Sequence, residues 1–301
     1  VGLIIPTLNA GEHFKKLVTS INTQKLNLSR KLVIDSGSLD NTVNLAKENH
    51  YEVMHIDKSS FNHGKTRQLG IDYFMDIDIA VFLTQDVILH DENSISNLVA
   101  VFENTQVGAA YGRQLPHANA SPLAVQARMF NYPAESKCKS YADKAELGIK
   151  TAFMSDSFAA YRMSALKEVG GFPHVIVSED MYVAAKMLMM GYQIVYEAEA
   201  CAYHSHDYTL FQEVQRYFDI GVFQSREPWI REEFGGAEGE GVRLVKEQLN
   251  YLIRNNGIHC IPKAIIANAV KLIGYRLGMY EKYLPVKLKK SLSGQKYFSF
   301  K

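Results

Sequence analysis

The stretch FNHGKTRQLG, residues 61–70, contains a glycine, a lysine and a threonine in the order that phosphate-binding loops use. In a P-loop, the pattern G-x-x-x-x-G-K-[ST] places backbone N–H groups around the phosphates, and the lysine reaches them as well. Counting back from Gly64, the first glycine of that pattern falls on position 59, which is Ser59. An ATP-binding loop therefore stays an alternative interpretation of this stretch and is not the favoured one.

Polar side chains follow four short apolar runs, and together they could bind a small molecule. The four groups are Pro6-Thr7-Leu8-Asn9, Asp35-Ser36, Asp57 and Gln85-Asp86. In an open parallel sheet, ligands bind beyond the carboxyl ends of the strands. If the four runs are neighbouring parallel strands, their ends form a polar rim rich in carboxylates, and this rim is the predicted binding edge.

A parallel sheet is what the hydrophobic pattern of the first half predicts. Strands are predicted over residues 3–7, 31–38, 51–57 and 79–86, and helices over 11–24 and 38–50. In the first helix, Phe14, Leu17, Val18 and Ile21 are spaced to form one buried face. Strands that alternate with helices favour an α/β fold with right-handed crossovers.

The second half is predicted to add a helix, a long strand and another helix. The helix over 178–191 begins after Ser178 as its N-cap and stops at Gly191, while the later helix covers 209–225. The strand over 192–207 ends in His204 and His206, which lie two residues apart and so share one face of a strand. The acidic, glycine-rich stretch 232–241 is the natural boundary before the remaining chain.

Residues 242–301 carry most of the positive charge. They contain twelve Lys and Arg residues against two Glu, a net charge of +10 in a chain whose total is +1. This asymmetry favours an anionic partner. The stretch mixes apolar and basic residues at helical spacing, which fits a helix lying on an anionic membrane surface. The alternative is a packed helical hairpin with a solvated basic face.

Composition limits the class of protein. The 301 residues are 47% hydrophobic and 22% charged, which is typical of a globular chain. We find no run of about 18 apolar residues, the length that a membrane span needs. Three widely separated cysteines, Cys138, Cys201 and Cys260, favour a reduced cytosolic protein. We expect a cytoplasmic protein, peripheral on the inner face of the cytoplasmic membrane, with no nucleic-acid partner.

Six motifs taken together resemble family 2 glycosyltransferases of the GT-A fold. They are LIIPTLNAG, VIDSGSLDNT, FNHGKTRQLG, FLTQDVIL, SED and YHSHDYT, which occur in the order and rough spacing of that family. FNHGKTR and TQD are most similar to the bacterial rhamnosyltransferase branch. The resemblance covers about residues 1–225.

The resemblance implies a Rossmann-like α/β fold, a mostly parallel sheet flanked by helices with a basic C-terminal helical extension. The implied catalytic domain is 1–231, with a nucleotide-binding half near 1–112 and an acceptor half near 113–231. The linker is then 232–241 and the extension 242–301.

The resemblance also implies a donor site. Pro6, Thr7 and Asn9 would line the nucleoside pocket, and Asp35 would accept a hydrogen bond from the pyrimidine N3–H, since a carboxylate is a pure acceptor. In the alternative, Asp35 only caps a turn. Further donor contacts are implied for Gly64, Arg67, Gln85 and Asp86. Gly64 would let the backbone approach the donor, and Arg67 would form a charge-assisted fork on the nucleotide. The alternative for Arg67 is a solvated side chain at a helix start.

Asp86 is the metal ligand that the resemblance implies. This chain has TQDVI where the family commonly has Asp-x-Asp, so a single carboxylate is present. His204 or His206 would complete the site for a divalent cation, Mn²⁺ or Mg²⁺. The alternative is a pair of ordinary surface histidines.

Asp180 is the implied base that deprotonates the acceptor hydroxyl. It lies in the first turn of a predicted helix, where the dipole stabilises an anion by roughly 0.3–1 kcal/mol. The dipole favours the ionised form that a base needs, without itself raising basicity. Ser157, Glu179 and Arg216 are expected near the acceptor or the diphosphate.

The predicted function is inverting transfer of L-rhamnose from dTDP-L-rhamnose. The acceptor would be a hydroxyl of a saccharide or lipid-linked acceptor in O-antigen or other surface polysaccharide synthesis. Three alternatives stay open: a UDP- or GDP-linked donor, a non-catalytic nucleotide-sugar binding module, and a P-loop NTPase or kinase.

Overall fold

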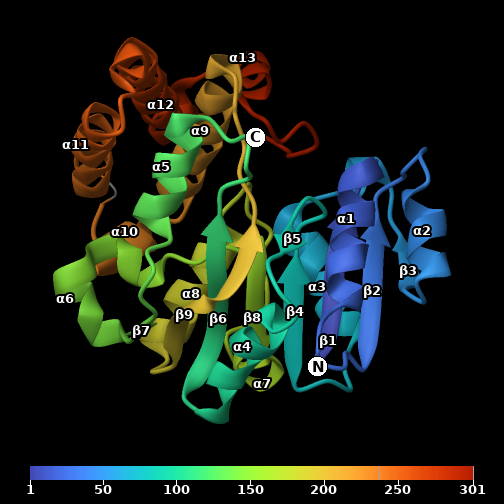
Figure 1. Cartoon of the computed structure of the whole chain (residues 1–301). Helices are drawn as coiled ribbons and strands as arrows, with labels where there is room; N and C mark the ends of the chain where they lie inside the picture. The colour runs from blue at the N-terminus through green and yellow to red at the C-terminus, as the bar shows by residue number, and fades with distance from the viewer. Residues whose placement is uncertain (237, 301) are drawn as a thin grey trace.

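The computed structural model describes residues 1–236 and 238–300, and in them one nine-stranded sheet lies between layers of helices (Figure 1). The strands are β1 Gly2–Thr7, β2 Arg30–Asp35, β3 Glu52–His55, β4 Ile79–Leu83, β5 Ile88–Leu89, β6 Val107–Leu115, β7 Lys137–Lys139, β8 Phe158–Arg162 and β9 Gln193–Tyr203. The helices are α1 Gly11–Asn22, α2 Thr42–Glu48, α3 His63–Tyr73, α4 Ser94–Ala100, α5 Pro122–Asn131, α6 Lys144–Leu147, α7 Met163–Glu168, α8 Glu179–Met189, α9 Leu210–Arg226, α10 Pro228–Phe234, α11 Glu238–Arg254, α12 Ile261–Met279 and α13 Val286–Leu292.

The strand order is β3-β2-β1-β4-β8-β6-β9-β5, and β7 pairs with β9. The first four strands are parallel, whereas β8 runs antiparallel to both β4 and β6. The register places Thr7 beside Asp35, so the ends of β1 and β2 meet at one edge. The four strands predicted from the first half are present in the predicted order. The prediction of a mostly parallel α/β sheet is therefore confirmed.

Helices on both faces of the sheet bury its apolar side chains. On one face, Phe14 and Leu17 of α1 pack in a cluster with Leu3 and Ile5 of β1. On the other face, α3 and α8 contribute to a second cluster that contains Ile4 and Phe82. Alternate residues of β1 thus enter opposite layers, as the two-residue period of a strand requires.

The ends of α8 and β9 decide where the candidate site residues lie. Ser178 precedes α8 with a left-handed φ of 63°, and its side chain makes no capping hydrogen bond. Gly191 follows the helix with φ 88°, as its predicted stop role requires. β9 ends at Tyr203, so His204 and His206 lie beyond the strand and not on it as predicted. Thr209 and Gln212 form a capping box at the start of α9.

The C-terminal helices pack closely on α9. A Cβ atom on Gly278 of α12 would lie only 2.1 Å from the backbone oxygen of Phe218 in α9. Gly274 of α12 and Gly221 of α9 leave no room for a Cβ either. Glycine therefore permits a helix crossing that any side chain would block.

The predicted linker 232–241 is largely helical in its described part. Residues 232–234 end α10, and residues 238–241 begin α11, while residue 237 lies outside the described residues. The domain boundaries themselves stay a prediction. No helix in the described ranges has the length and apolar character needed to cross a bilayer.

Candidate active site

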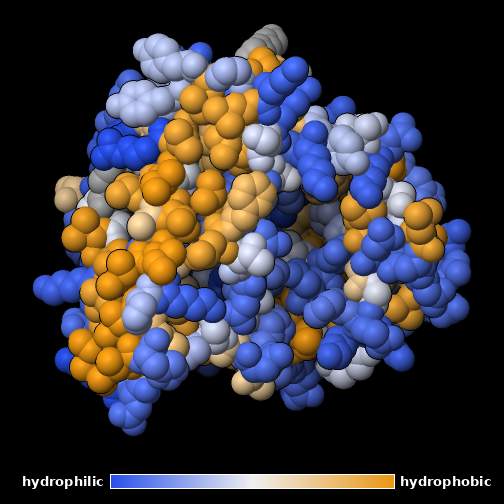
Figure 2. Space-filling model, turned by 90° about the horizontal axis from the view of Figure 1, so that it is seen from above, coloured by the Kyte–Doolittle hydropathy of each residue, from blue (hydrophilic) through white to orange (hydrophobic). Residues whose placement is uncertain are grey.

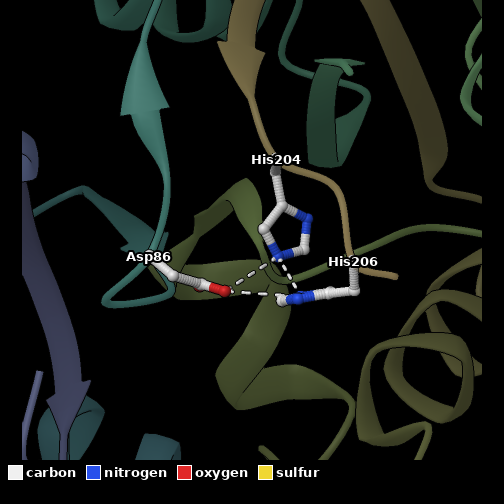
Figure 3. Close-up of side chains that lie close together, drawn as sticks. All are labelled: Asp86, His204 and His206. Carbon is white, nitrogen blue, oxygen red and sulfur yellow. Dashed lines mark hydrogen bonds and ion pairs between the residues drawn. The ribbon is translucent and has the colours of Figure 1, made fainter. Parts of the chain in front are cut away.

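Three side chains that could hold a metal ion converge at the ends of β4 and β9. Asp86 follows β4 after a short turn, and His204 and His206 follow β9 (Figure 3). The Oδ2 atom of Asp86 lies 3.5 Å from Nε2 of His204 and 3.3 Å from Nε2 of His206. The two Nε2 atoms are 3.0 Å apart. Ligand atoms about 2.1 Å from one cation lie at such spacings from each other.

The neighbours of His204 fix which of its nitrogens faces this cluster. Gln114 Oε1 receives a hydrogen bond from Arg128 Nη1, and arginine has no acceptor, so the Gln114 atom must be the oxygen. The same oxygen lies 2.8 Å from Nδ1 of His204, which must then carry the proton and donate. His204 Nε2 therefore faces Asp86: it donates to that carboxylate when the ring is protonated, and it offers a lone pair to a cation when the ring is neutral.

The charge state of the cluster also suits a cation. Burial alone would raise the pKa of Asp86, but hydrogen bonding from His204 and the nearby histidines lower it below its usual range. Burial and then the proximity of His204 lower the pKa of His206 to about 4. At neutral pH, Asp86 is ionised and His206 is neutral. One carboxylate and two imidazole nitrogens fit a divalent cation with mixed O and N ligands.

Asp180 lies in the first turn of α8 and is half-buried. Its carboxylate accepts hydrogen bonds from the backbone N–H groups of Asp156, at 3.2 Å, and Met181, at 2.8 Å. Burial, followed by the charges of Asp156 and Glu179, raises the pKa of Asp180 well above its usual value. The dipole of α8 favours the ionised carboxylate and so lowers this pKa. The loss of hydration and the repulsion from Asp156 and Glu179 raise it by more. Asp180 is therefore a stronger base than its position in a first helical turn alone predicts.

Arg67 is buried, and its guanidinium is paired with two protein carboxylates. Only 3% of the residue is exposed. Its Nε lies 3.1 Å from Asp156 Oδ2, and its Nη1 donates to Glu179. Glu179 is also buried, and its carboxylate is bound by this guanidinium. The fork expected on the nucleotide is thus formed on two protein carboxylates.

Gly64 also makes a different close contact from the predicted one. A Cβ there would lie 2.0 Å from the backbone oxygen of Pro173, so the glycine lets two protein segments meet. The surrounding geometry is not that of a P-loop either. Gly64, Lys65 and Thr66 lie inside α3, whose N-cap Asn62 accepts from Lys65 N–H.

The predicted nucleoside residues do meet at the carboxyl edge of the sheet. Asp35 is 1% exposed and accepts from the hydroxyl of Thr7, the backbone N–H groups of Gly37 and Ser38, and the hydroxyl of Ser38. These four bonds occupy the acceptor positions of a carboxylate. In this structure Asp35 caps the turn, the alternative role considered from the sequence.

Neighbouring rim residues connect the strand ends. Gln85 forms a reciprocal pair with the backbone of Leu8, at 2.7 Å and 3.2 Å. Asn9 has a left-handed φ of 47° and accepts from Leu39 N–H. Pro6 is partly exposed at the end of β1. The loops after β1, β2 and β4 are thereby held in one arrangement.

A cavity of about 1150 Å³ joins the metal-type cluster to Asp180. It is also lined by Ser157 and Arg216. The exposed Arg216 side chain has its guanidinium 5.5 Å from the centre of the Tyr208 ring. Glu179 is not among the lining residues. The cavity continues between helices α5, α11 and α12, where Gln248, Lys263 and Lys271 line it.

Two residues that line this cavity, Gln114 and Arg128, were not predicted from the sequence. Arg128 lies in α5, in a region with no recognisable motif, and Gln114 is a buried polar residue near the end of β6. Only their spatial proximity to His204 reveals them, so no signal in the single sequence could have found them.

The sequence is similar to those of known glycosyltransferases. Residues 3–170 match the family model described as glycosyl transferase family 2. The chain is 48% identical over 301 residues to the O-antigen chain rhamnosyltransferase RfbN of Salmonella typhimurium, covering 99% of this chain and 94% of that protein. It is 45% identical over 299 residues to the O-antigen chain rhamnosyltransferase WbaN of Salmonella anatum, covering 99% and 93%.

A solved structure shows the same architecture. The mannosyltransferase PcManGT of Pyrobaculum calidifontis, determined with GDP-Man and Mn²⁺, superimposes with a TM-score of 0.66 at 14% identity, covering 93% of this chain and 87% of that chain. Likeness at this identity shows the fold. The GT-A fold predicted from the sequence is therefore confirmed.

Proposed function

Since the chain belongs to glycosyl transferase family 2, we propose that this glycosyltransferase moves L-rhamnose from dTDP-L-rhamnose onto an acceptor hydroxyl, with inversion at the sugar C1. The two O-antigen chain rhamnosyltransferases, similar over 99% of the chain, support the sugar and the surface-polysaccharide setting. The acceptor is a saccharide or a lipid-linked saccharide. The donor nucleotide is the finer part of the proposal, because UDP and GDP donors occur on the same fold.

The observation that carries the proposal is that Asp180 and the Asp86, His204 and His206 cluster line one cavity. In the reaction, Asp180 accepts the proton of the acceptor hydroxyl. The oxygen forms a bond to C1 as the bond from C1 to the diphosphate oxygen breaks, and the electron pair leaves with the nucleoside diphosphate. The raised pKa of Asp180 makes it a stronger base for this step.

We propose that Asp86, His204 and His206 hold a divalent cation, Mn²⁺ or Mg²⁺. When bound, the cation supplies charge neutralisation for the departing diphosphate. Arg216 and Arg128 both line the same cavity, and Arg128 donates to Gln114. Their positive charges act on the same developing negative charge, which is electrostatic stabilisation by fixed groups. The rim of Pro6, Thr7, Asn9, Asp35 and Gln85 is the proposed nucleoside side.

The proposal also places the enzyme on the inner face of the cytoplasmic membrane, with α12 as the contact. Ile265, Ile266, Leu272 and Ile273 are between 51% and 57% exposed and recur at helical spacing along one side of this helix. Viewed from above, apolar side chains gather on the side of α11 and α12, whereas the side of the N-terminal strands is mostly hydrophilic (Figure 2). An apolar helix face beside basic residues fits an anionic lipid surface.

The C-terminal helices and the turn between α12 and α13 also carry exposed basic residues, which are Lys246, Arg254, Lys263, Arg276, Lys282, Lys287 and Lys290. Another side of α12 lines the cavity through Lys263, Ala267 and Lys271. One side of α12 therefore borders the cavity while another side is the proposed lipid contact, which would bring a lipid-linked acceptor close to the site.

The test is transfer from dTDP-L-rhamnose to a lipid-linked saccharide, with calorimetric titration of dTDP, UDP, GDP and ATP in the presence and absence of Mn²⁺. We expect dTDP to bind most tightly and to need the cation. Asp180→Asn should abolish transfer while dTDP affinity changes less than about twofold, because the amide cannot accept the proton. Tighter binding of ATP, or substantial turnover by the Asn variant, would overturn the proposal. Binding of dTDP without turnover by the wild type would identify a non-catalytic module.

A further inference from the structure

Helix α3, which contains most of FNHGKTRQLG, docks against the segment that leads into α8. The contact at Gly64 brings its backbone against Pro173. Asn62 Nδ2 donates to the backbone oxygen of Val175 at 2.6 Å, and the backbone N–H of Phe172 donates to Gln68 Oε1 at 2.7 Å. Three separate contacts therefore hold residues 172–175 in place. These residues lead into the first turn of α8, which contains Asp180.

Arg67 lies at the centre of this contact. Its guanidinium connects two carboxylates that come from different parts of the chain, Asp156 before β8 and Glu179 in α8. Tyr161 Oη donates to the other oxygen of Asp156 at 2.6 Å. Both carboxylates adjoin Asp180, because Glu179 precedes it in sequence and the backbone N–H of Asp156 donates to it. Arg67 thus holds both immediate neighbours of the proposed base.

The same segment reaches the metal-type cluster. Ser155, next to Asp156, accepts a hydrogen bond from Gln114 Nε2 at 2.9 Å. Gln114 Oε1 in turn orients His204. A continuous path of hydrogen bonds and one peptide unit therefore runs from His204 to Asp180. Arg67 is paired with Asp156, the last link of this path before Asp180.

We propose that Arg67 is a positioning residue, which sets the location of Asp180 relative to the Asp86, His204 and His206 cluster and does not touch the nucleotide. This inference rests on the proposed function, since it takes Asp180 as the base. Asp156, Glu179 and Asp180 would repel one another in a site with little water. The guanidinium is the cation that lets them lie together, and its two-sided fork fixes their directions.

Charge at Arg67 must also affect the titration of Asp180. The charged and titratable groups that surround this cluster are Asp156, Glu179, Arg67, His63, Tyr132 and Tyr161. Among these, Arg67 is the permanent cation. Removing it should raise the pKa of Asp180 further, so the acid limb of the rate profile should move to higher pH.

The experiment compares Arg67→Gln and Arg67→Lys with the matched control Lys65→Gln, an exposed cation on the same helix. We expect Arg67→Gln to lower kcat by about 100-fold, as a small misplacement of a catalytic group does. Its KM for the donor and its calorimetric affinity for dTDP with Mn²⁺ should stay within about twofold of the wild type. Arg67→Lys keeps the charge but loses the fork, so it should recover part of kcat and restore the wild-type acid limb. Lys65→Gln should match the wild type.

Two results would overturn the inference. Weaker dTDP binding with unchanged kcat in Arg67→Gln would place Arg67 on the nucleotide, and an equal loss in Lys65→Gln would show general damage to α3. If Arg67→Gln does not fold, Glu179→Gln takes its place. This substitution removes the ion pair between Arg67 and Glu179 but leaves a side chain of nearly the same shape. Full kcat in Glu179→Gln would then contradict the inference. A failure of the proposed function itself would look different from these results. The wild type would then be inactive, or Asp180→Asn would be active.

Discussion

The Nε2 atoms of His204 and His206 lie 3.0 Å apart in the structure, closer than two lone pairs would remain without a cation or proton between them. The hydrogen bond to Gln114 puts the His204 proton on Nδ1, so either the Nε2–H tautomer of neutral His206 donates to His204 or a cation lies between the two nitrogens. The proposed metal site takes the second arrangement.

Replacing His206 with Ala should therefore weaken Mn²⁺ binding. The expected loss exceeds the roughly 10- to 100-fold that losing an outer partner costs, because His206 would be a direct ligand. Electron paramagnetic resonance of free and bound Mn²⁺ measures the affinity without any turnover. His90→Ala is the matched control, since His90 lies on the surface and contacts Tyr203. Equal Mn²⁺ affinity in both variants would remove His206 from the site.

Gln114 gives a sharper test of the same site. Gln114→Leu removes the acceptor for His204 Nδ1–H, so His204 can adopt the other tautomer, and Mn²⁺ affinity should fall by about 10- to 100-fold. Gln114→Glu keeps an acceptor for both His204 and Arg128, and it should bind Mn²⁺ at least as tightly as the wild type. The proposed tautomer is wrong if the Leu and Glu variants bind Mn²⁺ alike.

The exposed stripe on α12 predicts binding to anionic vesicles. Replacing Ile265, Ile266, Leu272 and Ile273 with Ser should abolish sedimentation with phosphatidylglycerol vesicles, because the apolar contact area is lost. Wild-type binding should decrease as salt is raised, since about 1 kcal/mol per nearby basic residue is electrostatic. Leu39→Ser is the control, as Leu39 is 95% exposed in the N-terminal half. Unchanged sedimentation of the fourfold variant would exclude α12 as the contact.

Lys139 predicts a pH dependence of stability. This lysine is 3% exposed, and burial lowers its pKa to about 7. The unfolded value is about 10.4, so between pH 7 and 10.4 the unfolded chain holds more protons and the folded state gains stability as pH rises. The cost of burying the charged form is therefore greatest below pH 7.

Urea unfolding at pH 6 to 10 measures this effect by comparison with Lys139→Met. The stability of the wild type relative to the variant should be level below pH 7 and then rise by up to about 1.4 kcal/mol per pH unit. Lys15→Met, at an exposed lysine of α1, should show a constant difference. A level difference for Lys139→Met across the whole range would show that folding does not lower the pKa of this lysine.

The sequence predicted the parts of the molecule that depend on local pattern. The four parallel strands, helices α1, α8 and α9 and the stop at Gly191 follow from residue periodicity and capping preferences. Asp86 and the two histidines come together because strand ends meet at one edge of a sheet. The two histidines lie beyond β9, however, because the pairing of β9 with β6 ends at Tyr203. The hydrophobic pattern does not specify where that pairing ends.

The contacts of Arg67 and the raised pKa of Asp180 could not be predicted in the same way. Arg67 and Glu179 are 112 residues apart in the chain, and no local pattern indicates that they meet. Asp35 at a strand end is compatible with either a ligand or a turn cap, and the sequence pattern did not indicate the four donors that surround it in the structure. The pKa of Asp180 likewise depends on Asp156, which the sequence places 24 residues away.

The glycine crossing of α9 and α12 has a mechanical consequence. Because Gly274 and Gly278 let the two backbones touch, neither helix can slide or roll on the other without a clash. Arg216 is on α9, and the apolar stripe is on the outer side of α12. The helix that carries Arg216 and the helix that carries the apolar stripe are therefore packed as one unit, which a larger residue at Gly274 or Gly278 would separate.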